Sequence, residues 1–308
     1  MRKTVDSEIP VVRRLAEHIS SGGGKRLRPA LVLLASQFCG YDSDEDIRYA
    51  AVFELIHTAT LIHDDIIDHA AIRRGNPTLN AKWGNALSVL FGDFIAIKAT
   101  RTALAGRNQD ITEVIVDAAI SMIEGELIQN ECVFSLETSR DTYFEIIQRK
   151  TGFLFAACAE CGAILGGKDK AFRQSLSRFG MEFGTAFQLV DDLLDFVSTS
   201  DQLGKPVFSD LHEGKLTLPL IALLEKAPSV AAPLIERIWA NGPSAISERD
   251  TQKLMELMEQ YGTLDEAREL AKLASNDAIS SLPANIGGDA DIAKLLQEAP
   301  KIMLERTR

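Results

Sequence analysis

Apolar residues recur at intervals of three and four positions through most of the chain, while runs that alternate apolar and polar residues are scarce. The first pattern is typical of an α-helix with one buried face, and the second would indicate strands. Glycine and proline clusters interrupt the helical pattern at residues 22–24, 75–77, 166–167, 204–206 and 241–243. They mark turns between helices, so we expect an all-α fold of about a dozen helices.

The interruptions are too short to be linkers between domains. A chain of 308 residues would suit about two domains of average size, but we predict a single domain over residues 1–308. Helix starts are predicted at residues 43–46 (SDED) and 263–266 (TLDE), because both fit a capping box. Few residues precede the segment at 22–29, so we expect the N-terminal helix to be truncated.

Composition and charge exclude several classes of protein. Hydrophobic residues make up 46% and charged residues 25%, which is typical of a folded chain. The net charge of -11 argues against a nucleic-acid binder and a polybasic membrane-surface protein. No apolar run reaches the roughly 18 residues of a membrane span, and no secretory signal is recognisable. We expect a cytoplasmic protein.

Two of the four cysteines have CxxC spacing. Cys158 and Cys161 lie in the apolar run 153–165, and no second pair or nearby histidine pair completes a zinc site. The pattern therefore predicts thiols buried in a helix.

Two segments share an acidic pattern. Residues 59–68 read ATLIHDDIID and residues 186–195 read AFQLVDDLLD. On a helix the first and last aspartate of DDxxD lie on one face, where their charges repel. Carboxylates among apolar residues require cations, and sets of oxygen ligands suit Mg²⁺. The alternative is a solvated acidic face or a helix end. The predicted metal ligands are Asp64, Asp65, Asp68, Asp191, Asp192 and Asp195.

Basic residues near the first aspartate cluster indicate an anionic substrate. Residues 22–29 read GGGKRLRP, where glycines let backbone N–H groups approach an anion and arginine forks match phosphate oxygens. Arg73 and Arg74 follow the first cluster, and His57 lies two helical turns before Asp64. Further polar or basic candidates are Lys150, Thr151, Gln188, Lys205 and Lys215.

In this order and at these spacings, the motifs resemble the trans-isoprenyl diphosphate synthases, and within them the long-chain bacterial enzymes such as octaprenyl and decaprenyl diphosphate synthases. The similarity runs from about residue 13 to about residue 225. It implies a prenyltransferase with an all-α bundle around a deep cavity, usually a homodimer. The implied reaction joins isopentenyl diphosphate to an allylic diphosphate, farnesyl or similar, and supplies a quinone side chain.

The resemblance also implies a role for each matching residue. Two or three Mg²⁺ per active site would be bound by the six aspartates. Arg73 would contact the allylic diphosphate, and Lys25, Arg28, His57 and Arg74 would hold isopentenyl diphosphate. Lys150, Thr151, Gln188 and Lys205 would position the allylic substrate or its leaving group. The residues implied in catalysis itself are Asp64, Asp65, Asp68, Arg73, Lys150 and Lys205.

Product length is expected to depend on the residues before Asp64. Helical side chains lean toward the N-terminus, so the growing tail would run past Ala59 and Thr60, about 6–8 Å along the axis. Short-chain members of the family usually carry aromatic residues there, so these small side chains predict a long product. Possible walls, which would otherwise be ordinary core, are Phe53, Ile56, Phe91 and Phe94.

Three alternatives stay open at this point. A terpene cyclase or squalene-type enzyme usually replaces the second cluster, and a non-catalytic subunit of a heteromeric synthase normally lacks one cluster, whereas both are intact here. A farnesyl or geranylgeranyl synthase is disfavoured by Ala59 and Thr60. The choice among C30, C40 and C50 products, the preferred primer, and homodimer against heteromer stay undecided.

Overall fold

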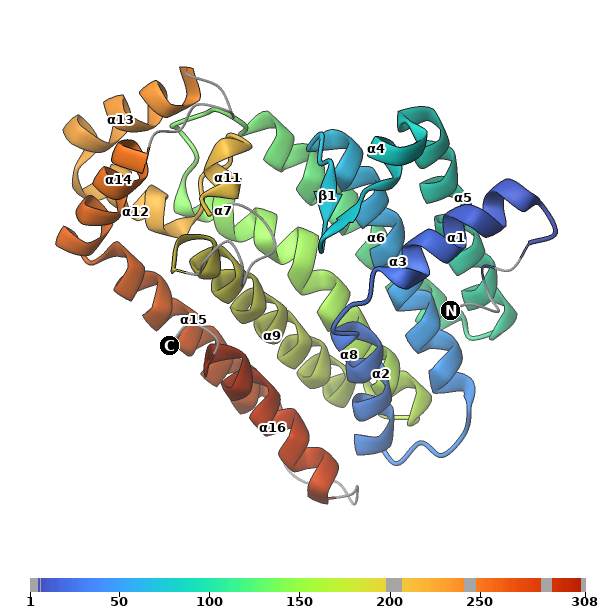
Figure 1. Ribbon diagram of the computed structural model, residues 1–308. Helices are drawn as coiled ribbons and strands as arrows, with labels where there is room; N and C mark the ends of the chain where they lie inside the picture. The colour runs from blue at the N-terminus through green and yellow to red at the C-terminus, as the bar shows by residue number, and fades with distance from the viewer. Residues whose placement is uncertain (1–4, 6, 198–206, 241–247, 284–289, 306–308) are drawn as a thin grey trace. The chain divides into compact units, whose positions relative to one another are not determined.

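The computed structural model describes residues 5, 7–197, 207–240, 248–283 and 290–305. These residues are almost entirely helical, which confirms the predicted all-α class (Figure 1). They divide into two compact units, one of residues 1–119, 154–180 and 283–294, and one of residues 120–153, 181–282 and 295–308. The single domain over residues 1–308 stays a prediction.

The first unit is built around the long helix α3. Its elements are α1 (Pro10–Ser21), α2 (Leu27–Phe38), α3 (Glu45–Ile67), α4 (Leu79–Trp83), α5 (Asn85–Ala105), α8 (Phe153–Leu165), the first parts of α6 (Gln109–Glu131) and α9 (Lys170–Val197), and the start of α16 (Ala290–Leu304). Helix α3 packs against α2, α4 and α5. A Cβ atom at Gly92 of α5 would lie 2.3 Å from His63 Nε2 on α3, so glycine at this position leaves room for the His63 ring.

Helix α8 carries the CxxC pair as predicted. Cys158 and Cys161 are fully buried, and both thiols are free. Burial raises the pKa of each thiol, and raises that of Cys39 to about 12, so they are protonated and unreactive at neutral pH. The prediction of core thiols is confirmed.

A small β-hairpin follows α3 and was not predicted. Strands β1 (Ile72–Arg73) and β2 (Asn76–Pro77) pair antiparallel, with Arg73 opposite Asn76. The turn between them is formed by Arg74 and Gly75, whose φ angles are 52° and 75°. Two consecutive residues with positive φ form the tight turn that matches the twist of a hairpin. The sequence indicated a turn here but not the paired strands.

The second unit centres on helix α12. Its elements are the remainder of α6, α7 (Arg140–Ile147), the π-helical turn η1 (Gln148–Gly152), the remainder of α9, α11 (Ser209–His212), α12 (Leu218–Lys226), α13 (Pro228–Ala240), α14 (Glu248–Gln260), α15 (Thr263–Ser281) and the end of α16. Helix α12 packs against α7, α13, α14 and α15. Arg140 of α7 bridges Glu225 and Glu266 at 2.7 and 2.5 Å, which ties α7 to α12 and α15.

The two capping boxes located helix starts but not the caps themselves. Helix α3 begins at Glu45 and α15 at Thr263, yet their N-cap residues are Asp44 and Gly262, and neither provides a side-chain cap. Side-chain caps occur instead at Ser139, which accepts from Thr142 N, and at Thr78, which accepts from Ala81 N.

Among the described residues, no helix combines the length and the low charge that crossing a bilayer requires.

Candidate active site

The first aspartate cluster lies at the C-terminal end of α3 rather than in its interior. Asp64 and Asp65 belong to the last turn, and Asp68 is the residue that ends the helix. Carboxylates are unfavourable there, because the helix dipole places negative charge at the same end. Asp65 is buried, whereas Asp64 and Asp68 are half-buried. The cluster therefore requires positive charge nearby.

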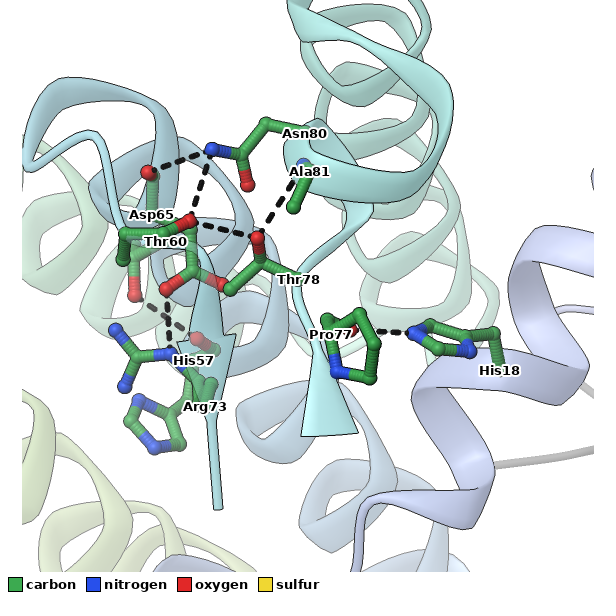
Figure 2. Close-up of polar contacts among 10 residues, drawn as sticks. His18, His57, Thr60, Asp65, Arg73, Pro77, Thr78, Asn80 and Ala81 are labelled. Carbon is green, nitrogen blue, oxygen red and sulfur yellow. Dashed lines mark hydrogen bonds and ion pairs between the residues drawn. The ribbon is translucent and has the colours of Figure 1, made fainter. Parts of the chain in front are cut away.

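Arg73 supplies part of that charge. Its Nε donates to Asp65 Oδ1 at 2.6 Å, as Figure 2 shows. Burial raises the pKa of Asp65, and the arginine opposes this shift. The predicted metal ligand and the predicted allylic-diphosphate ligand are thus partners in this structure. A diphosphate that binds here would compete with Asp65 for Arg73. A cation that binds here would compete with Arg73 for Asp65.

His57 lies in a strongly positive environment. It is half-buried on α3, and its pKa is held well below its usual value first by burial and then by Arg28, Arg74 and Arg73. The imidazole is therefore neutral at neutral pH and donates through a single N–H. An anion placed among these arginines would raise its pKa again, so the observed environment suits a diphosphate.

The side chain of Arg28 is suited to binding an anion. Burial lowers its pKa to about 10, and its guanidinium stacks 4.6 Å from the centre of the Phe155 ring. Its Nε is buried and has no hydrogen-bond partner among the described residues. A buried polar atom without a partner is costly, so an anionic ligand at this position would be strongly stabilised.

The glycine turn and the hairpin are joined by a direct contact. Arg74 Nη1 donates to Gly23 O at 2.6 Å, and Lys25, two residues further on, is exposed. Arg26 has a left-handed backbone conformation at the start of α2 and pairs with the buried Glu54. The first unit thus brings Arg28, His57, Arg73 and Arg74 into one positive environment beside the first aspartate cluster. Their roles as substrate ligands stay a prediction.

The second aspartate cluster lies near the end of α9 and is held by neutral donors. Asp191 is exposed, but Asp192 is buried and accepts from Tyr143 Oη at 2.5 Å and from Gln188 Nε2 at 2.8 Å. Gln188 in turn accepts from Thr151 Oγ1 at 2.9 Å. Burial raises the pKa of Asp192 to about 6, although the two donors lower it. Asp192 is thus engaged on both oxygens.

Asp195 is engaged in the same way. Its exposed fraction is 1%, and its two carboxylate oxygens accept from Ser209 Oγ at 2.7 Å and from Asp210 N at 3.2 Å. Its backbone carbonyl also accepts from Phe208 N at 3.0 Å. The carboxylate therefore fixes the start of α11 to α9.

Lys150 and Thr151 lie in the π-helical turn η1, a feature that is frequent at functional sites. Lys150 forms an ion pair with Glu126 and donates to Gln129 Oε1 at 3.0 Å, both on α6. This approach depends on Gly125, where a Cβ atom would lie 2.9 Å from Lys150 Cγ. Of the other candidates, Lys215 pairs with Glu213 at 2.7 Å, and Lys205 lies outside the described residues.

The residues predicted to govern chain length lie one turn before the first cluster. Ala59 is buried, and Thr60 is half-buried and donates to the carbonyl oxygen of His57 at 2.9 Å. Phe53, Ile56 and Phe91 are buried in the core of the first unit, and Phe91 stacks on Phe94 with ring centres 6.1 Å apart. Their role as walls stays a prediction.

The described residues contain no group of three or more His, Cys, Asp or Glu side chains arranged to hold a metal ion by themselves. Mg²⁺ keeps several waters and is usually bound through one or two carboxylates together with substrate phosphates. Asp64, Asp68 and Asp191 are the least buried of the six carboxylates and so the most suitable for such binding.

A sequence profile of the Polyprenyl synthetase family matches residues 9–258. The chain belongs to the polyprenyl synthetase family. The resemblance inferred from the motifs is confirmed, and the chain is a prenyltransferase of the polyprenyl diphosphate synthase type.

Three relatives illustrate the range of the family. The chain is 37% identical over 278 residues to the octaprenyl diphosphate synthase of Escherichia coli (strain K12), covering 90% of this chain and 85% of that protein. It is 35% identical over 276 residues to a short chain isoprenyl diphosphate synthase of Methanothermobacter thermautotrophicus, covering 88% and 84%. A polyprenyl synthase from Caulobacter crescentus CB15, crystallised with calcium and isoprenyl diphosphate, has 36% identity and a TM-score of 0.90, covering 99% and 92%.

Several polar residues of this polyprenyl synthetase site were missed by sequence reasoning. Tyr143 lies 49 residues from Asp192, and Glu126 and Gln129 lie on a different helix from Lys150. No spacing rule connects residues so far apart, so only the fold shows these pairs. Thr78 and Asn80 were also missed, although they lie only four and six residues after Arg74.

Proposed function

We propose that this chain is a long-chain trans-polyprenyl diphosphate synthase, which joins isopentenyl diphosphate head to tail onto an allylic diphosphate such as farnesyl diphosphate. The observation that carries the proposal is the positive environment of His57. Arg28, Arg73 and Arg74 all lower its pKa, and Arg73 also contacts the first aspartate cluster. An anion site beside carboxylates is what a metal-bound diphosphate and a second diphosphate require.

In this proposal the six aspartates of the two DDxxD segments would bind two or three Mg²⁺ ions per active site, and Asp64, Asp68 and Asp191 are the least buried of the six. When bound, Mg²⁺ would neutralise the charge of the allylic diphosphate and so favour its departure. Asp65 keeps Arg73 in place, whereas Asp192 keeps Gln188 and Thr151 in place. The calcium in the Caulobacter crescentus relative supports a site for divalent cations.

The chain's own residues would act on the two diphosphates. Arg73, with Lys150, Thr151, Gln188 and Lys205, would bind the allylic diphosphate as the bond from its oxygen to the allylic carbon breaks and the electron pair leaves with it. Lys25, Arg28, His57 and Arg74 would hold isopentenyl diphosphate, whose double bond attacks that carbon. A proton is then lost to the released diphosphate. Fixed cations stabilise the developing negative charge without reorganisation.

The proposal of a long product rests on the small side chains of helix α3. Ala59 is small and buried one turn before Asp64, and Thr60 keeps its hydroxyl on the helix backbone, so neither projects a large side chain. Overall identity does not decide the length, because the octaprenyl and the short-chain relatives are similar to this chain at 37% and 35%. Supply of a quinone side chain is part of the proposal.

We further propose a homodimer in the cytoplasm. Helix α5 exposes Leu90, Ile97 and Leu104, seven residues apart, with exposed fractions of 64%, 69% and 58%. Such a stripe of large apolar side chains is typical of a helix that packs against another subunit. A single-chain mass in sedimentation velocity would exclude the dimer. The free thiols of Cys39, Cys158 and Cys161 suit a reducing compartment.

The decisive experiment is to incubate the purified protein with labelled isopentenyl diphosphate, farnesyl diphosphate and Mg²⁺, and to separate the products by chromatography. We expect polyprenyl diphosphates longer than C20, and none after chelation of the metal. A product that stops at C15 or C20 would support the short-chain synthase, a cyclic hydrocarbon the terpene cyclase, and no product the subunit of a heteromeric synthase.

A further inference from the structure

The β-hairpin of residues 72–77 carries two arginines but has little support of its own. Each strand has two residues, and all residues of the hairpin except Arg73 are exposed. An isolated two-stranded hairpin is marginally stable in water. The position of Arg73 and Arg74 must therefore be set by contacts outside the hairpin.

Two polar side chains immediately after the hairpin supply such contacts. Thr78, with an exposed fraction of 4%, donates from Oγ1 to Ala70 O at 2.7 Å. Asn80 donates from Nδ2 to Asp65 O at 3.1 Å and to Ala70 O at 3.0 Å. Figure 2 shows the amide of Asn80 directed toward Asp65, whose carboxylate also contacts Arg73.

These contacts connect both Arg73 and Asn80 to Asp65. Asp65 is held through its carboxylate by Arg73 and through its backbone carbonyl by Asn80. The Asp65 carbonyl at the end of α3 also accepts from Ala70 N at 2.9 Å, so Asn80 adds a second hydrogen bond to it. The residues on both sides of the hairpin, Ala70 before it and Thr78 after it, are joined by the threonine hydroxyl.

The orientation of the Asn80 amide is fixed by these contacts. Its NH₂ group faces two carbonyl oxygens, and the reverse orientation would place oxygen against oxygen. The Oδ1 atom is buried and has no hydrogen-bond partner among the described residues. A buried acceptor left unsatisfied is unfavourable, which indicates that the two donated hydrogen bonds determine where this side chain lies.

We propose that Thr78 and Asn80 are positioning residues, which hold the hairpin so that Arg73 and Arg74 face the diphosphates. This inference rests on the proposed function, because it assigns the two arginines to diphosphate binding. A purely structural alternative exists for Thr78, since its hydroxyl also accepts from Ala81 N at 3.3 Å and so caps α4. The test must separate the two roles.

The variants are Thr78→Val, which removes the hydroxyl at nearly constant volume, Thr78→Ser, which retains it, and Asn80→Ala. Thr138→Val is the matched control, because Thr138 is also a buried loop threonine whose hydroxyl donates to a loop carbonyl, Ser135 O at 3.2 Å. Asn80 is half-buried, so Asn80→Ala keeps the test open if Thr78→Val does not fold.

Two measurements on substrate-free protein test the positioning itself. Amide hydrogen exchange of residues 71–76 is expected to accelerate about tenfold in Thr78→Val and Asn80→Ala, the effect of losing about one hydrogen bond. Calorimetry with inorganic diphosphate and Mg²⁺ is expected to show about tenfold weaker binding in the same variants. Thr78→Ser and Thr138→Val should match the wild type in both. A cap alone would leave diphosphate affinity unchanged.

Steady-state kinetics add a third readout. We expect the KM values for the two diphosphates to rise in Thr78→Val and Asn80→Ala while kcat changes little. Unchanged exchange in residues 71–76, or faster exchange with unchanged diphosphate affinity, would overturn the inference. The proposed function is tested separately, by whether the wild type makes a polyprenyl product. The effects of the variants on hydrogen exchange and diphosphate binding can be measured whether or not such a product forms.

Discussion

Asp65 and Asp192 occupy the same position in two DDxxD segments, yet one faces an arginine and the other a tyrosine and a glutamine. Arg73 contacts Asp65 at 2.6 Å, whereas Tyr143 and Gln188 contact Asp192 at 2.5 and 2.8 Å. Burial raises the pKa of both carboxyl groups. The neutral donors leave Asp192 with a pKa of about 6, so they compensate burial only in part.

The clusters also differ in how deeply their carboxylates are buried. In the second cluster Asp192 and Asp195 each accept two hydrogen bonds from the described side chains and backbone, and Asp191 is exposed. In the first cluster Asp64 and Asp68 are half-buried at the end of a helix. The same spacing of aspartates therefore does not give the two clusters the same role. We infer that Asp191 serves the ligand, and that its two neighbours hold α7, α9 and α11 in place.

The largest effect is expected from the first aspartate of each cluster. Asp64→Ala and Asp191→Ala should each lower kcat about 10²–10³-fold, since each removes a charge that stabilises the transition state through the metal. Their free energies of unfolding should stay within about 0.5 kcal/mol of the wild type. Asp277→Ala, an exposed aspartate of α15, is the control. Wild-type turnover of either variant at saturating Mg²⁺ would reject its metal role.

A smaller effect, on stability, should distinguish the buried members. Asp195→Ala leaves the Ser209 hydroxyl and the Asp210 N–H without their acceptor and should lower the free energy of unfolding by about 2–3 kcal/mol. Urea unfolding of metal-free protein measures this value beside Asp64→Ala. If both variants lose equal stability, the distinction between the clusters is wrong.

The smallest effect concerns pH. Because the pKa of Asp192 is raised from 3.8 to about 6, the folded state binds more protons than the unfolded state between these values, and this group's contribution to stability falls as pH rises through that window. Tyr143→Phe removes a donor to the carboxylate and should raise the pKa further. The substitution should lower the free energy of unfolding by about 1 kcal/mol at pH 7 and by less at pH 5. An equal cost at both pH values would contradict this account.

The helices and most turns could be predicted from the sequence, because hydrophobic periodicity and the clustering of charge are local properties. The apolar run around Cys158 and Cys161 and the basic groups near Asp64 are of this kind. The partners of Asp192 and Lys150 were not predictable, since Tyr143 and Glu126 lie far away in the sequence. The hairpin at residues 72–77 was missed because two-residue strands have no periodicity to detect.

The account depends most on α3, which would both hold the allylic diphosphate and leave space for a long tail. The most direct test is to compare the products of the wild type and Ala59→Tyr, with Ala59→Ser as the control, on labelled isopentenyl diphosphate and farnesyl diphosphate. We predict long products from the wild type and Ala59→Ser, and a markedly shorter product from Ala59→Tyr with the first condensation retained. An unchanged distribution of products in Ala59→Tyr would contradict the account.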